Sequence, residues 1–132
     1  MKALSGRARE VMNLLTEGLR VERHRVIDNA KGAYMAVHVE KLRLTEQGIL
    51  FSVAHYYEQN GDLMRDPDME FLKVGDDYYP VYMRQDGGGA YEREAVVYGK
   101  DGKIERYYPR MQADLAFFAN QWMKNIKEQQ KL

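Results

Sequence analysis

The segment His55-Tyr-Tyr-Glu-Gln-Asn-Gly-Asp-Leu-Met-Arg-Asp-Pro-Asp-Met-Glu-Phe71 places an Asn-Gly pair between two runs with the composition of β-strands. Asn60 and Gly61 accept the positive φ angles of a type I′ turn, so the segment predicts a tight antiparallel hairpin. If Gln59 faces Asp62 across this turn, the rest of the register follows residue by residue. It pairs His55 with Asp66, Tyr56 with Arg65, Tyr57 with Met64, and Val53 with Asp68.

A proline interrupts the second run of this hairpin. Pro67 has no N–H to donate to a neighbouring strand, which predicts either an edge strand or a bulge where the strand bends. A bulge shifts the pairing beyond it, so the register after Asp66 stays open. Strand alternation predicts a mostly apolar face with Leu63, Arg65, Pro67, Met69 and Phe71, and a polar face with Met64, Asp66, Asp68 and Glu70.

Arg65 falls on the mostly apolar face in this register, opposite Tyr56 and diagonal to Glu58. A partly buried guanidinium needs a carboxylate or an aromatic ring beside it. We therefore expect a structural role for Arg65, and expect its replacement by alanine to cost on the order of 1–3 kcal/mol if a buried charge is left unpaired.

Amphipathic helices are predicted at both ends of the chain. Near the start, Ser5 is a candidate N-cap and Gly18 a candidate stop. Near the end, Pro109 suits the first position of a helix. Two apolar stripes have helical spacing: Leu4, Ala8, Val11, Leu15 and Leu19, then Met111, Leu115, Phe118, Trp122 and Ile126. We expect the second stripe, with Trp122, to form core, and residues 124–132 to be a frayed polar tail.

Between the helices, strand-like runs alternate with turn signals. The runs cover residues 20–27 (an edge strand), 34–44, 49–57, 63–71, 78–83, 90–98 and 104–108. No helix separates consecutive strands, which excludes parallel βαβ units. The sequence therefore predicts one α+β domain over residues 1–132, with a curved antiparallel meander of five or six strands and the terminal helices on one face.

The bulk composition excludes several classes of protein. The chain has 132 residues, of which 45% are hydrophobic, with 20 basic and 20 acidic residues and no cysteine. Balanced charge argues against binding nucleic acid through bulk electrostatics, and the lack of cysteine excludes disulfides and thiolate chemistry. We find no signal peptide and no apolar run long enough to span a membrane, so we expect a cytoplasmic protein that does not contact the membrane.

Residues Ala54 to Phe71 resemble a segment of a small family of uncharacterised bacterial proteins that are encoded on conjugative elements, plasmids and prophages. Tyr78-Tyr-Pro-Val81 looks like a looser continuation of this resemblance. It implies an accessory protein of a mobile element, with action against host defence as one role. No catalytic residue is carried over to this chain.

His55 and Asp66 are the only candidates for catalysis that the sequence offers. A histidine oriented by a carboxylate is the arrangement of a general base, which gives one hypothesis: a small hydrolase or metal-dependent enzyme centred on this pair. The chain has no Gly-x-Ser-x-Gly motif, and Ser52 falls on the opposite face from His55. Asp68 could join the pair as a metal ligand, but no His-Glu-x-x-His or calcium-loop pattern is present. We therefore predict no metal site and no cofactor, and regard His–Asp as more often a structural pair.

A binding surface is the function that the composition favours. Ten tyrosines recur on consecutive predicted strands, beside the acids of the hairpin. Tyrosine is enriched at protein interfaces, whereas carboxylates repel the phosphates of nucleic acids. We expect a non-enzymatic module that binds a protein partner, with nucleic acid ranked lower and the oligomeric state undetermined. The candidate binding residues are Tyr57, Glu58, Asp62, Asp66, Asp68 and Glu70, and the residues expected to be structural are Asn60, Gly61, Arg65, Pro67 and Trp122.

Overall fold

The computed structural model describes residues 1–132 and contains two helices and eight strands. In chain order these are α1 (Gly6–Thr16), β1 (His24–Ile27), β2 (Val37–Leu44), β3 (Ile49–Gln59), β4 (Asp62–Val74), β5 (Asp77–Gln85), β6 (Tyr91–Glu94), β7 (Val96–Tyr98), β8 (Ile104–Tyr107) and α2 (Pro109–Gln130). The first six strands form one antiparallel sheet in sequence order, and β7 and β8 form a separate pair.

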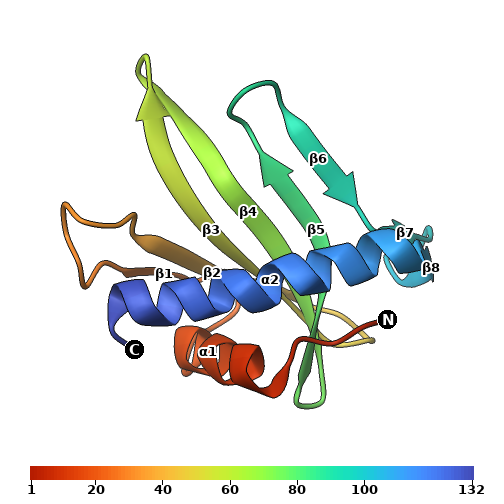
Figure 1. The fold of residues 1–132 in the computed structure, drawn as a ribbon. Helices are drawn as coiled ribbons and strands as arrows, with labels where there is room; N and C mark the ends of the chain where they lie inside the picture. Colours follow the sequence, from red (N-terminus) through yellow and green to blue (C-terminus); the bar gives the residue numbers. More distant parts are fainter.

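Both helices lie on one side of the six-stranded sheet, and α2 crosses its strands (Figure 1). We call this side the helix-covered face and the other side the free face. The predicted α+β fold, with terminal helices on one face of an antiparallel meander, is confirmed. Neither helix has the combination of length and apolar composition that crossing a membrane requires.

The main core lies between the helices and the sheet. Both predicted stripes contribute to it, and it includes Val11, Leu15, Leu115, Trp122 and Ile126 from the helices and Val39, Val53, Met69, Phe71 and Tyr78 from the strands. Ser5 caps α1 as predicted, because its hydroxyl accepts a hydrogen bond from the Ala8 N–H at 3.3 Å. The helix ends at Thr16, and Gly18 follows with a φ of +73°.

The Asn-Gly hairpin forms as predicted. Asn60 and Gly61 have φ angles of +54° and +84°, which is the left-handed region that a type I′ turn requires. The predicted pairings nearest the turn are also confirmed: Gln59 with Asp62, Tyr57 with Met64, and Tyr56 with Arg65.

The predicted bulge occurs at Pro67, and it changes the register. Asp66 and Pro67 together lie opposite His55, after which Ala54 pairs with Asp68 and Val53 with Met69. The predicted pairing of Val53 with Asp68 was therefore wrong, and His55 faces a two-residue bulge rather than Asp66 alone. Of the two alternatives predicted for Pro67, the structure shows the bulge and not the edge position, because β4 lies between β3 and β5.

The extra residue in β4 also reverses the faces on either side of the bulge. Asp66 lies on the helix-covered face near His55, whereas Arg65 shares the free face with Asp68 and Glu70. Two predictions were therefore wrong: Arg65 is not on the apolar face, and Asp68 and Glu70 do not extend the His55–Asp66 pair.

The last two strands leave the main sheet. The predicted strand over residues 90–98 is broken at Ala95, which is fully buried and whose N–H donates to Val81 O at 2.9 Å. Beyond it, β7 and β8 fold over one end of the free face. There they close a second apolar cluster of Leu50, Leu72, Val81 and Val96.

The end of the chain is ordered, contrary to the predicted frayed tail. Helix α2 continues to Gln130, which is fully buried. The Gln130 side chain accepts a hydrogen bond from Asn29 N at 2.7 Å and donates one to Met35 O at 3.1 Å. The polar residues of this segment suggested fraying, but the Gln130 amide instead forms hydrogen bonds with backbone groups of the β1–β2 connection.

Candidate functional site

The free face of the sheet carries a row of polar side chains that crosses five strands. Since β7 and β8 cover only one end of this face, the rest is open. Alternation along the paired strands places these residues on it: His38 and Glu40 from β2, Ser52 and Tyr56 from β3, Arg65, Asp68 and Glu70 from β4, Tyr82 and Arg84 from β5, and Glu92 and Glu94 from β6.

Four of these residues form what we call the carboxyl cluster: Glu40, Asp68, Glu70 and Glu94. Burial raises the pKa of Asp68 to about 6 against the opposing charge of Arg65, and the charges of Asp86 and Glu40 add to the rise. Burial likewise raises the pKa of Glu70 to about 7, with further contributions from Asp68 and Glu94. The pKa of Glu94 is also raised by burial. Near neutral pH Glu70 is therefore protonated in part of the molecules, and Asp68 becomes protonated just below neutral pH.

Asp68 lacks a partner inside the protein. Its Oδ1 atom is buried and makes no hydrogen bond. Neither Asp68 nor Glu70 belongs to any ion pair of the structure. Buried carboxyl oxygens are nearly always hydrogen-bonded, so an unpartnered one on an open sheet face makes Asp68 a candidate for ligand contact.

Two arginines beside the cluster are bound to a carboxylate outside it. Arg65 Nε donates to Asp86 Oδ2 at 2.8 Å, and Arg84 Nε donates to Asp86 Oδ1 at 3.0 Å. These bonds, led by the one from Arg65, hold the pKa of Asp86 well below its usual range. Arg84 also donates to Glu92 at 3.2 Å. The expected carboxylate partner of Arg65 is thus present, but it is Asp86, the residue that follows β5.

Tyrosine rings frame the carboxyl cluster. Tyr82 pairs with Glu70 across the strands, and its hydroxyl donates to Glu92 at 2.7 Å. Burial and this hydrogen bond raise the pKa of Tyr82 to about 12. Burial also raises the pKa of Tyr56 and of Tyr98. All three rings are therefore neutral at physiological pH and present aromatic surface beside the carboxyls.

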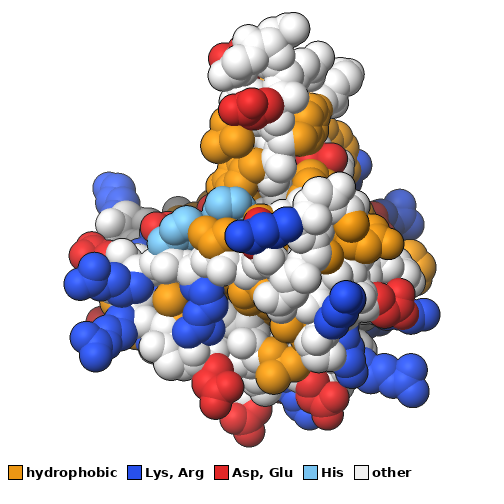
Figure 2. Space-filling model, turned by 90° about the vertical axis from the view of Figure 1, so that its left-hand side faces the viewer, with side chains coloured by type: hydrophobic (Ala, Val, Ile, Leu, Met, Phe, Trp, Pro, Cys, Tyr) orange, Lys and Arg blue, Asp and Glu red, His pale blue; other side chains and the backbone are white.

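Two histidines extend the free face toward the β1 edge. His24 Nε2 and His38 Nδ1 lie 3.1 Å apart, and the rings stack with centroids 5.3 Å apart. The Tyr56 ring meets His38 edge-on. Histidine side chains gather at the surface below the projecting β3–β4 arm (Figure 2). Burial and then the charge of His24 lower the pKa of His38.

His55 and Asp66, the catalytic candidates, line one cavity on the helix-covered face. His55 is only 4% exposed, and its Nδ1 accepts a hydrogen bond from Trp122 Nε1 at 3.3 Å, which requires the proton of neutral His55 to be on Nε2. That Nε2 atom has no partner. Asp66 instead accepts a bond from Gln85 at 3.4 Å. Burial lowers the pKa of His55, despite the opposing charge of Asp66.

The structure separates the predicted binding residues into four locations. Glu58 and Asp62 are exposed at the hairpin tip, and Asp66 lies on the helix-covered face. Tyr57 packs its hydroxyl against Gly87 of the β5–β6 loop, where a side chain would collide with it. Asp68 and Glu70 alone come together on the free face. No three histidine or carboxylate side chains of the chain are placed to hold a metal ion.

Sequence reasoning missed the cluster members that lie outside the hairpin. Glu40 and Glu94 come from strands on opposite sides of β4, and Tyr82 reaches the site through a second bulge between Glu70 and Phe71. Alternation within each strand gives the face of each residue, but only the strand order brings them together. The alternating Tyr82-Met-Arg84 and Glu92-Arg-Glu94 patterns were the signals available in the sequence.

Comparison with known proteins gives a family. No curated protein and no solved structure matches the chain. A family model described as a domain of unknown function (DUF6908) matches residues 7–132. This span holds all eight strands, α2, and all but the first residue of α1. The chain therefore belongs to the DUF6908 family of domains of unknown function.

Proposed function

We propose that this domain is a non-enzymatic binding module that holds a basic segment of a protein partner on the free face of its sheet. One observation carries the proposal: Asp68 and Glu70 are half-buried residues of β4 that form no ion pair, and Asp68 Oδ1 has no hydrogen-bond partner. Of the nearby cations, Arg65 and Arg84 are engaged by Asp86, and Arg43 lies 5.9 Å from the centre of the Tyr98 ring.

A lysine or arginine side chain from a partner supplies what the cluster lacks. A cation beside Asp68 and Glu70 lowers their pKa values and converts both to carboxylates, so the complex gains charge-assisted hydrogen bonds. The rings of Tyr56 and Tyr82 can flank the aliphatic part of such a side chain and add a cation–π contact. Arginine and tyrosine contacts of this kind are common anchors of protein interfaces.

The charge of the free face favours a protein over a nucleic acid. This face has three arginines, Arg43, Arg65 and Arg84, against five acids, namely Glu40, Asp68, Glu70, Glu92 and Glu94, and Asp86 adds a sixth. Ionised carboxylates repel phosphates, and protonated ones offer them few donors. This supports the ranking of protein above nucleic acid as the partner.

The resemblance to proteins of conjugative elements, plasmids and prophages suggests the biological setting of the proposed binding. We place the module among accessory proteins of bacterial mobile elements, with a host protein as the partner and interference with host defence as the consequence. The support for this part is the resemblance over Ala54 to Phe71.

The hydrolase hypothesis has weaker support from the geometry. A general base needs a free acceptor nitrogen within reach of a substrate. In His55 the acceptor Nδ1 is occupied by Trp122, and the side chain is 4% exposed. We therefore assign His55 and Trp122 to the structure of the core.

A matched pair of variants tests the binding proposal. We would capture partners from a bacterial lysate with wild-type protein, with D68N/E70Q, and with E58Q/D62N, which changes two exposed acids at the hairpin tip. We expect wild type and E58Q/D62N to retain the same partner and D68N/E70Q to lose it. Capture that is unchanged in D68N/E70Q, or lost equally in both variants, would refute the assignment of the carboxyl cluster.

A further inference from the structure

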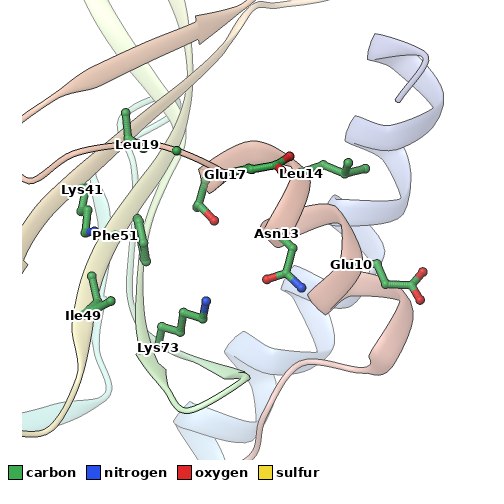
Figure 3. A pocket seen from close by; sticks show the side chains of 11 residues that line it. Glu10, Asn13, Leu14, Glu17, Leu19, Lys41, Ile49, Phe51 and Lys73 are labelled. Carbon is green, nitrogen blue, oxygen red and sulfur yellow. The ribbon is translucent and has the colours of Figure 1, made fainter.

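A second concave surface lies on the opposite side of the sheet from the carboxyl cluster. It is a cleft of about 810 Å³ between α1 and the strands β2, β3 and β4 (Figure 3). Its sheet wall consists of Lys41, Ile49, Phe51 and Lys73, and its other wall is α1 with the following Gly18 and Leu19. Cleft volumes of this order are typical of sites for small organic molecules.

The register explains why two lysines share this wall. Lys41 pairs with Phe51, and Ile49 pairs with Lys73, so both lysines flank the apolar side chains of β3 on the helix-covered face. Helix α1 ends above them, so no helix covers the helix-covered face beside the two lysines. The lysines and the apolar floor are therefore placed together by the strand pairing and by the length of α1.

Lys73 contacts an aromatic ring, and neither lysine has an anionic partner. Lys73 Nζ lies 5.4 Å from the centre of the buried Tyr78 ring. The Tyr78 hydroxyl donates in turn to Asn13 Oδ1 of α1 at 2.8 Å, so the ring is fixed. Neither Lys41 nor Lys73 belongs to any of the ion pairs of the structure.

The acids near the cleft limit how much negative charge it can accept. Glu10 and Glu17 line the α1 wall, and Figure 3 shows Glu10 pointing away from the lysines. Two glutamates at the rim repel a polyanion such as a nucleic acid, whereas a single negative group can reach the lysines beyond them. The apolar floor of Leu19, Ile49 and Phe51 then suits a compact hydrocarbon body.

We propose that this cleft binds a small organic monoanion, namely a carboxylic acid with a compact aromatic or branched aliphatic body. The carboxylate lies between Lys41 and Lys73, and the body packs on Leu19, Ile49 and Phe51. This site lies on the opposite face from the carboxyl cluster, and neither proposal depends on the other.

The test uses 3-phenylpropionate as the probe and its neutral amide, 3-phenylpropionamide, as the ligand control. Binding would be followed by NMR from the methyl signals of Ile49 and Leu19. The variant K41M/K73M keeps the aliphatic stems and removes both charges. The matched control K31M/K100M removes two exposed lysines elsewhere.

We expect the acid to give saturable shifts at Ile49 and Leu19 in wild type and in K31M/K100M, and at least tenfold weaker binding in K41M/K73M. The amide should bind wild type at least tenfold more weakly than the acid. The single variants K41M and K73M, each checked for fold, should give intermediate affinities if the double variant does not fold. No saturable shift, equal binding of acid and amide, or lysine variants that bind as well as wild type would overturn the proposal.

Discussion

Replacing Glu70 by glutamine should make the protein more stable at neutral and alkaline pH. Burial raises the pKa of Glu70 from 4.5 to about 7, so the folded state binds a proton that the unfolded state has already lost between these values. The folded state therefore loses stability as the pH rises from about 4.5 to about 7. A glutamine has the shape of the protonated acid and carries no charge to bury.

The pKa difference sets the size of the effect. At about 1.36 kcal/mol for each pKa unit, the rise from 4.5 to about 7 corresponds to a ceiling of about 3.4 kcal/mol. Glu70 is only half-buried, so solvent screens part of this penalty, and we expect about 1–2 kcal/mol. The variant E70Q should equal wild type in stability at pH 4 and exceed it by about 1–2 kcal/mol at pH 8.

Urea denaturation at a series of pH values from 4 to 8.5 would measure this difference. E58Q is the matched control, because Glu58 is exposed at the hairpin tip, and its difference from wild type should stay within about 0.5 kcal/mol. If E70Q is no more stable than wild type at pH 8, or if their difference does not change with pH, the reasoning about the carboxyl cluster is refuted. A stabilising substitution that abolishes binding would identify Glu70 as a residue retained for function.

Three further predictions concern stability and are checked by chemical denaturation. Gln130→Ala should cost about 2–4 kcal/mol, because it leaves the Asn29 N–H and a second backbone group of the β1–β2 connection without partners; an unchanged midpoint would contradict this. Gly48→Ala should cost about 1–3 kcal/mol, since an added Cβ would overlap the carbonyl oxygen of Lys73. A variant as stable as wild type would show that the start of β3 can move away from β4 at little cost. Arg65→Ala should lower the denaturation midpoint and speed amide exchange in the β5–β6 loop, because Arg65 binds Asp86, the first residue of that loop. Unchanged amide exchange in the loop would refute this anchoring role.

Local sequence signals predicted the elements well, because each has a short-range physical cause. Asn60-Gly61 fixes the turn through its φ angles, and Ser5 and Pro109 mark helix starts through capping and a missing N–H. Pro67 correctly indicated a bulge. Which residues would lie on each face of the sheet could not be predicted, because the extra residue of a bulge can lie on either of the two paired strands. Its position decides which side chains move to the other face.

The long-range arrangement was harder to infer. The interruption of the strand at Ala95 depends on a hydrogen bond to Val81 and on burial against the core, which no local pattern reveals. The carboxyl cluster likewise depends on strand order, since Glu40 comes near Asp68, and Glu94 near Glu70, only after folding. The acid-rich hairpin pointed toward the site through Asp68 and Glu70, whereas its other acids proved to lie elsewhere.

The pH dependence of partner affinity tests the binding proposal most directly. With the captured partner, or a peptide from its basic segment, calorimetric titrations would be run between pH 5.5 and pH 8 on wild type, D68N/E70Q and E58Q/D62N. The pKa values of about 6 and about 7 predict that wild-type affinity rises about a hundredfold over this range, because a cation binds the ionised cluster and displaces the protons of both Asp68 and Glu70. The E58Q/D62N control should follow wild type, and D68N/E70Q should bind weakly at every pH. An affinity that is independent of pH, or that is unaffected by D68N/E70Q, would contradict the account.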